Sequence, residues 1–229
     1  VVADVRHLPK EVILEKLHGI RELAITFEHA DPLTQPIPIR PTCHYSMGGI
    51  DVVDYKSCGT VVPGLFAAGE AACVSVHGAN RLGGNSLADA VVFGKVAGEG
   101  AIDYVKNNSA KDAKKALSEA ATAWETRFRE VTGRKDGRPI AEIRDEMANA
   151  MWNKVGIFLE ESKMQEALAT INKLIEEYKT CYVGDTNRTF NMAFVNYVEV
   201  GSLLTVAKAV VMGALRRQES RGSHLREDY

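Results

Sequence analysis

Apolar residues recur at helical spacing along most of the chain. The first such pattern runs from Val12 to Phe27, between Pro9 and the Asp31-Pro32 pair, and predicts one helix. A second and longer helix is expected from about 87 to 106. Further helical patterns follow near residues 111–131, 139–155, 163–180 and 190–220. We therefore expect an antiparallel helical bundle of low contact order in the second half of the chain.

Between the first two helical patterns the chain changes to short extended stretches. Three prolines at positions 36, 38 and 41 favour an extended segment, because proline fixes its backbone angle and donates no hydrogen bond. A strand is expected around Ile50–Val53. The apolar run Leu65–Ala68, closed by Gly69, is typical of a buried parallel strand.

Composition and charge narrow the classes of function. The chain has 229 residues, of which 45% are hydrophobic and 25% charged, as in ordinary soluble globular proteins. Its formal net charge of -2 leaves no basic excess to neutralise phosphates, so no nucleic acid partner is expected. No apolar run approaches the ~20 residues that span a bilayer, and no signal peptide is recognisable.

The cysteines are the residues to examine for a metal centre. They lie far apart and include no CxxC pair, so a metal site or cluster ligated by this chain alone is not expected. Free thiols in a reducing compartment are the expected state. The four positions are Cys43, Cys58, Cys73 and Cys181.

A glycine-rich loop, His77–Ser86, carries the most specific chemistry in the chain. Arg81 stands among its glycines, directly before the long apolar helix. A guanidinium can bind a carboxylate through two hydrogen bonds at once, and glycines allow backbone and ligand to approach closely. Asn85 or Ser86 is expected to cap the helix, whose positive end would then face the ligand of Arg81. The alternative is a glycine-rich turn with a solvated arginine.

Two further residues outside this loop are candidates for binding. His44 follows the proline-rich segment and could donate to an anionic ligand; its alternative is a hydrogen-bonded structural histidine. Glu70 follows the strand expected at 65–68, a position used for contacts to cofactor hydroxyls, although it could instead cap a helix. No Ser-His-Asp, Cys-His or paired-carboxylate arrangement stands out. The sequence thus supplies anion binders rather than an obvious base or nucleophile.

Taken together, three motifs identify a family resemblance. The segments Pro41–Gly49 (PTCHYSMGG), Gly64–Glu70 (GLFAAGE) and His77–Ser86 (HGANRLGGNS) resemble, in order and spacing, the flavoprotein subunit of fumarate reductase and succinate dehydrogenase. The segment Glu219–His224 (ESRGSH) is similar to the end of that family's helical domain. The resemblance covers essentially the whole chain.

The resemblance implies a fold class and a domain organisation. The fold would be α/β plus α: part of an FAD-binding α/β domain and capping domain, followed by the antiparallel helical bundle. Residues 1–42 would be the tail of the capping domain and 43–107 the C-terminal part of the FAD-binding domain. Residues 108–222 would form the helical bundle, and 223–229 the start of a further segment.

The resemblance also implies roles for individual residues. His44 and Arg81 would bind the substrate carboxylates of fumarate or succinate. Glu70 would contact FAD, and Ser86 with Leu87 would lie against the flavin at the start of the helix. No catalytic residue is assigned in this chain, because the arginine that acts as proton donor in the family is expected upstream of Val1. The family's GxGxxG region and the histidine that carries FAD covalently are expected there too.

The same resemblance suggests partner subunits, a location and a physiological direction. An iron–sulfur subunit and a membrane anchor subunit would hold the protein at the cytoplasmic face of the inner membrane. The chain starts without methionine, so we expect a piece of a longer protein that alone neither retains FAD nor turns over. Fumarate reduction is favoured over succinate oxidation as the physiological direction.

Two rival interpretations of the sequence remain. L-aspartate oxidase has a similar loop and helical domain, but Met47 stands where that branch typically has cysteine. A non-catalytic module that uses the helical bundle as a docking scaffold is the rival of a different class. Its charged faces, however, are more often simply solvated.

Overall fold

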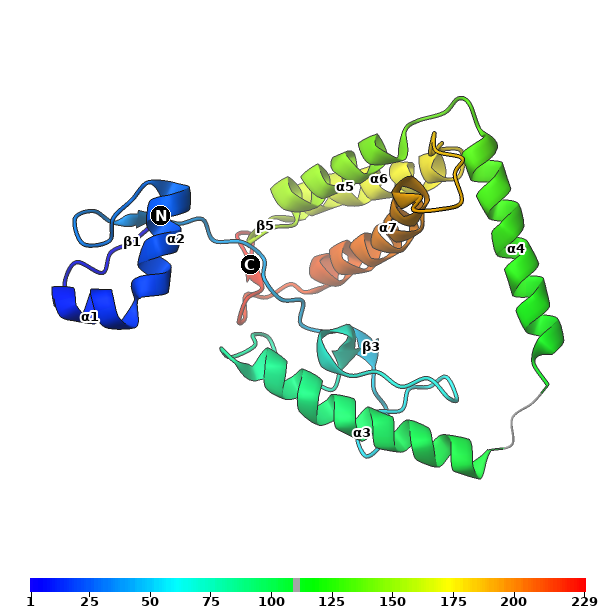
Figure 1. Cartoon of the computed structure of the whole chain (residues 1–229), viewed down its shortest axis with the longest axis horizontal. Helices are drawn as coiled ribbons and strands as arrows, with labels where there is room; N and C mark the ends of the chain where they lie inside the picture. The colour runs from blue at the N-terminus through cyan, green and yellow to red at the C-terminus, as the bar shows by residue number, and fades with distance from the viewer. Residues whose placement is uncertain (109–111) are drawn as a thin grey trace. The chain divides into compact units, whose positions relative to one another are not determined.

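The computed structural model describes residues 1–108 and 112–229 (Figure 1). The chain divides into two compact units, Val1–His44 and Tyr45–Tyr229, each of which is described by itself. The finer division expected from the sequence, into 1–42, 43–107, 108–222 and 223–229, stays a prediction.

The first unit holds two helices and a small antiparallel sheet. Strand β1 (Val2–Ala3) pairs with β2 (Ile37–Pro38), which belongs to the segment that the prolines were expected to extend. The single helix expected here is instead two helices, α1 (Lys10–Lys16) and α2 (His18–Glu28). Leu17, with φ -117° and ψ 19°, leaves the helical conformation and ends α1. Apolar spacing could not reveal this break, because it continues across both helices.

In the first unit, an ion pair with two hydrogen bonds joins α2 to the turn that follows it. Arg21 on α2 donates from Nε and Nη2 to the two carboxylate oxygens of Asp31, at 2.9 and 2.7 Å. This pair fixes the turn after α2 to the helix itself. Ile13 and Ala24 supply buried apolar surface in the two helices.

The second unit begins with a parallel pair of short strands. Strand β3 (Ile50–Asp51) lies beside β4 (Ala72–Cys73), and Val52 continues the ladder by donating to Cys73. The strand expected at Leu65–Ala68 is wrong: in the described residues Phe66 forms only an isolated antiparallel bridge with Gly59. A strand needs a neighbouring ladder, and an apolar run alone does not supply one.

Helix α3 (Asn85–Asn107) packs on the turn that precedes β4. That turn is the 3-10 helix η1 (Gly69–Ala71), and a Cβ at Gly69 would lie 3.5 Å from Ala90 of α3. Gly69 also has a φ of +69°, which other residues rarely adopt. Glycine therefore allows both the backbone turn and the close approach of the helix. The packed apolar residues are Val52, Cys58, Ala67, Ala72 and Val74, against Phe93, Val96 and Ala97.

The four helices expected in the second half of the chain are confirmed within a few residues. Helical periodicity located α5, α6 and α7 well because each buries part of its surface in the bundle, whereas α4 buries only Val131 and Thr132 near its C-terminus. The expected start of the first, at Lys111, lies outside the described residues. Their observed bounds are α4 (Lys114–Gly133), α5 (Ile140–Lys154), α6 (Glu161–Tyr178) and α7 (Met192–Arg216).

Helices α5, α6 and α7 share one apolar core. Successive helices of this set run in opposite directions (Figure 1). The C-terminal part of α4 joins them through Val131 and through the edge-on contact of Phe128 with Phe194. Strand β5 (Phe158–Leu159) pairs in parallel with β6 (Leu225–Arg226) and so ties the chain's last residues to the loop between α5 and α6.

Helix α7 is by length and composition able to cross a membrane, unlike any other helix in the described residues. The expectation that no apolar run approaches this length is therefore wrong for Met192–Arg216, which Glu199 and Lys208 interrupt without making it polar overall. Tyr197, Leu204 and Val211 of α7 are buried against α5 and α6, and these residues account for one face of the helix. Only 22% of its most apolar window is buried in the described residues, and Leu203, Val206 and Val210 are exposed.

Candidate functional site

The glycine-rich loop leads directly into α3. The helix begins at Asn85, and its N-cap residue is Gly84, in the left-handed region with φ +82°. The expected cap by Asn85 or Ser86 is therefore wrong, because both residues lie inside the first turn. No side chain of the described residues caps α3. The Asn85 N–H donates to the carbonyl of Leu82 at 3.2 Å, and the amides that follow it in the first turn are left to water or a ligand.

The surroundings of this loop are open. A Cβ placed on Gly83 or Gly84 would meet no described atom within 4 Å. Leu87, a large apolar side chain at the helix start, is 76% exposed. An apolar side chain and bare helix amides therefore face open space together.

Arg81 is held on an aromatic ring. Its guanidinium carbon lies 4.5 Å from the ring centroid of Tyr45, and its Nη1 donates to the carbonyl of Leu82 at 3.1 Å. Its Nε is buried and has no hydrogen-bond partner among the described residues. This contact was not predictable from local sequence, because Tyr45 lies 36 residues before Arg81 in the chain.

The hydroxyl group of Tyr45 contacts a buried carboxylate. Asp89 of α3 is 3% exposed, and its Oδ2 accepts from the Tyr45 hydroxyl at 3.3 Å and from His77 Nε2 at 3.0 Å. Burial, and then the charge and hydrogen bond of Asp89, raise the pKa of the Tyr45 hydroxyl above its ordinary value. The phenol is therefore a firm donor at neutral pH. A carboxylate so buried needs such partners. The sequence did not single out Asp89, because Glu99 and Asp103 lie in the same helix.

Glu70 lies in η1 and accepts a hydrogen bond from the backbone N–H of Ser46 at 3.0 Å. Its side chain is otherwise on the surface. This contact joins the Pro41–Gly49 motif to the Gly64–Glu70 motif. The expected contact of Glu70 with FAD stays a prediction.

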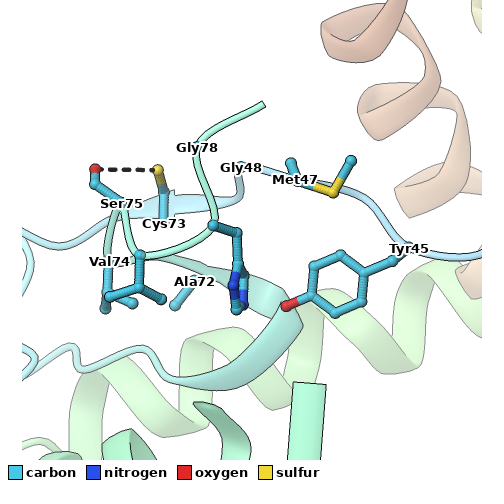
Figure 2. Close-up of a pocket in the computed structure, with 10 residues that line it drawn as sticks. Tyr45, Met47, Gly48, Ala72, Cys73, Val74, Ser75 and Gly78 are labelled. Carbon is cyan, nitrogen blue, oxygen red and sulfur yellow. Dashed lines mark hydrogen bonds between the residues drawn. The ribbon is translucent and has the colours of Figure 1, made fainter. Parts of the chain in front are cut away.

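A small hollow lies between the segment that precedes β3 and the segment that runs from β4 into the glycine-rich loop. Tyr45, Met47 and Gly48 line it from one segment, and Ala72 to Gly78 from the other (Figure 2). Its volume of about 30 Å³ is room for one or two water molecules, so this hollow alone does not hold a four-carbon diacid. At Gly49, the next residue along the chain, a Cβ would come within 2.5 Å of the Ala71 oxygen.

The other predicted site residues are placed as follows. His44 is the last residue of the first unit and is exposed, whereas Arg81, Ser86 and Leu87 belong to the second unit. Their expected convergence on one ligand stays a prediction. Ser86 and Leu87 lie in the first turn of α3, where the sequence analysis expected them.

The end of the chain returns to the glycine-rich loop. Ser223 donates from both its backbone N–H and its hydroxyl to the carbonyl of Ala79, each at 3.0 Å. A Cβ at Gly222 would overlap that same carbonyl, and Gly222 has a φ of +63°. The Glu219–His224 motif therefore anchors the loop that carries Arg81.

Replacing Gly222 by alanine should loosen this anchor. The clash with Ala79 and the left-handed backbone together should cost about 1–3 kcal/mol. In the full-length protein we expect faster proteolytic cleavage within residues 77–86 and a lower thermal midpoint. Gly213→Ala is the matched control, because a Cβ there meets no described atom within 4 Å and the residue is helical. Equal cleavage rates in the two variants would contradict the anchoring role.

Comparisons with known proteins find two matching protein families and similar proteins of known name. The family described as "FAD binding domain" matches residues 1–87, and "Fumarate reductase flavoprotein C-term" matches residues 144–229. The 8-methylmenaquinol:fumarate reductase flavoprotein subunit of Wolinella succinogenes is 46% identical over the whole chain. The succinate dehydrogenase flavoprotein subunit of Coxiella burnetii is 41% identical, also over the whole chain.

A solved structure gives the same result. A variant of Escherichia coli quinol fumarate reductase matches 99% of the chain with a TM-score of 0.89 and 39% identity. The chain spans only 37% and 40% of the lengths of the two curated relatives, and 38% of that solved chain.

Proposed function

Because the chain belongs to the family of flavoprotein subunits of fumarate reductases and succinate dehydrogenases, we propose that the whole protein interconverts fumarate and succinate at a site that includes Arg81 and His44. The family expected from the sequence motifs is confirmed, and so is FAD as the cofactor. The observation that carries the proposal is Arg81, set on a glycine-rich loop at the uncapped start of α3.

The residues at the start of α3 fit an anionic, partly apolar group such as a flavin. The first-turn amides of Ser86 and Leu87 and the helix dipole favour negative charge there. The exposed Leu87 side chain offers apolar contact, and the open space at Gly83 and Gly84 allows close approach. Glu70, nearer the strands, would accept from a hydroxyl of the same cofactor.

Arg81 and His44 would each bind one carboxylate of the diacid. The planar fork of Arg81 can donate two parallel hydrogen bonds to a carboxylate, and the His44 imidazole can donate one. Gripping both ends of a four-carbon substrate fixes which carbon faces the cofactor. FAD, when bound, supplies hydride exchange with that carbon. Arg81 would then stabilise the charge that gathers on the carboxylate in the transition state.

Partners and location follow from the family. We propose an iron–sulfur subunit that exchanges electrons with the flavin and a membrane anchor subunit beyond it. The protein would then be peripheral at the cytoplasmic face of the inner membrane. Similar proteins are named as fumarate reductases and as a succinate dehydrogenase, which supports membership of a respiratory complex. Fumarate reduction is our choice of direction.

The test uses the full-length protein loaded with FAD. Oxidation of a reduced viologen dye by fumarate and reduction of a dye by succinate should both occur, the first at the higher rate. Aspartate-dependent peroxide production without fumarate reduction would replace the proposal with an L-aspartate oxidase. Turnover of neither fumarate, succinate nor aspartate would favour the non-catalytic docking module.

A further inference from the structure

A chain of contacts runs from the body of α3 to the guanidinium of Arg81. Asp89, in the first turns of α3, holds Tyr45 by its hydroxyl and His77 by its imidazole. The two rings meet edge to face, with centroids 5.5 Å apart and an interplanar angle of 88°. Arg81 lies over the Tyr45 ring. Three elements that are separate in sequence therefore meet at one aromatic side chain.

The buried acid is the fixed point of this chain of contacts. The Asp89 side chain is 1% exposed and that of His77 12%. A carboxylate so buried is costly unless it is hydrogen-bonded, and here one oxygen receives both donors while Oδ1 has no partner among the described residues. Releasing Tyr45 would leave Asp89 with His77 alone. The tyrosine is thus held in place by the need to satisfy this acid.

The ring in turn has the right chemistry to orient a guanidinium. An aromatic face is electron-rich, and arginine is attracted to it within about 6 Å of the centroid. A phenol that donates to a carboxylate is polarised toward still higher electron density. The partly buried position of Tyr45 weakens competition from water. Arg81 Nε is buried and Nη1 already donates to the carbonyl of Leu82, so Nη2 and the second hydrogen of Nη1 are the donors left for a carboxylate.

We propose that Tyr45 is a positioning residue for Arg81, whose ring face, anchored through Asp89, sets the guanidinium for two-pronged binding of a substrate carboxylate. This inference rests on the proposed function, because it takes Arg81 as a carboxylate binder. Tyr45 itself does not touch the substrate. The face of its ring, more than its hydroxyl, carries the effect.

The experiment measures dicarboxylate affinity in the full-length FAD-loaded protein. Malonate is the probe, and its dissociation constant is read from the flavin difference spectrum. Tyr45→Leu removes the ring and should raise both this constant and the KM for fumarate about tenfold, the scale of a partly desolvated cation–π contact. Tyr45→Phe keeps the ring and should raise them less than about threefold. Tyr55→Leu, at a 60% exposed tyrosine of the same unit, is the control and should change neither.

A second series separates electrostatic positioning from simple packing. Phenylalanine at position 45 is compared with mono-, di- and trifluorinated phenylalanines, which keep its shape while withdrawing electrons from its face. The malonate dissociation constant should rise with each fluorine. A packing role predicts no such trend. This series also decides the matter if Tyr45→Leu fails to fold or to retain FAD.

The outcomes distinguish the inference from the proposed function. If Arg81→Ala leaves the malonate dissociation constant unchanged, the proposed function fails and the inference with it. If Arg81→Ala raises that constant but Tyr45→Leu and the fluorinated series do not, only the role of Tyr45 is overturned. A rise in Tyr45→Leu that disappears in an Arg81→Ala background would support the inference, because the two residues then act through one another.

Discussion

Replacing Arg81 by alanine should lower kcat/KM for fumarate by about a thousandfold in the full-length enzyme. Removing one partner of a close, hydrogen-bonded charge pair typically costs about 2–5 kcal/mol, which corresponds to factors of about 30 to 4,000. The upper part of this range is expected because the guanidinium would bind the substrate and also stabilise the charge of the transition state. Steady-state rates with a reduced viologen dye measure the effect.

Two companion variants make this result specific. Arg81→Lys keeps the charge but loses the fork, so its activity should fall between those of the wild type and the alanine variant. Lys95→Ala removes a positive charge from the same region, on α3, where the side chain is 76% exposed and pairs with Glu99. Its kcat/KM should stay within about twofold of the wild type. An Arg81→Ala variant within about tenfold of wild-type activity would contradict the proposed role.

Replacing Arg226 by alanine should give the largest loss of local stability. The Arg226 side chain is 0% exposed, and its Nε and Nη2 donate to the two oxygens of Asp228 at 2.6 and 2.8 Å. Its Nη1 also donates to the carbonyl of Arg217 at 3.1 Å, just beyond the C-terminus of α7. Alanine would remove all of these bonds, although Asp228 would keep the hydrogen bond from the Glu161 N–H and the Arg217 carbonyl its contact with His224. The expected cost is about 3 kcal/mol.

Hydrogen exchange in the full-length protein reports this loss. The N–H of Glu227 donates to Leu159 at 2.8 Å across the β5–β6 pair and should exchange at least about a hundredfold faster in the variant. Arg221→Ala removes a nearby but 67% exposed arginine and should change the exchange rate little. Equal protection of Glu227 in both variants would show that Arg226 does not hold β6 in place.

The same pair should make this stability depend on acid pH. The hydrogen bonds from Arg226 lower the pKa of Asp228 well below its ordinary value. A carboxyl whose pKa is lower in the folded state stabilises fully above its unfolded pKa of about 3.9. Its contribution is lost as the pH falls from there through the lowered folded value. Protection of Glu227 should therefore be insensitive to Asp228 between neutral pH and about pH 5.

The helices were predictable from the sequence, and the strands much less so. Periodic burial on one face located α3, α5, α6 and α7 within a few residues of their observed bounds. The break at Leu17 and the failure of Leu65–Ala68 to form a strand depend on backbone conformation and on neighbouring segments. Neither is encoded in the spacing of apolar residues.

The sequence supplied candidate binding residues, which stay predictions, but not the contacts that support them. The glycines around Arg81 made this arginine a candidate carboxylate binder, and the three motifs together indicated the family. The role of Asp89 could not be read in advance, because its partners lie 44 and 12 residues away in the chain. The contact of Ser223 with Ala79 spans 144 residues and is equally beyond local pattern. Support of this kind arises only when distant segments pack together.

Binding of a diacid compared with a monoacid tests the central claim most directly. Malonate and acetate are titrated into the full-length FAD-loaded protein, as wild type and as a variant that carries both His44→Ala and Arg81→Ala. We expect the wild type to bind malonate far more tightly than acetate, and the double variant to bind both equally weakly. A double variant that retains the wild-type affinity for malonate would contradict the account.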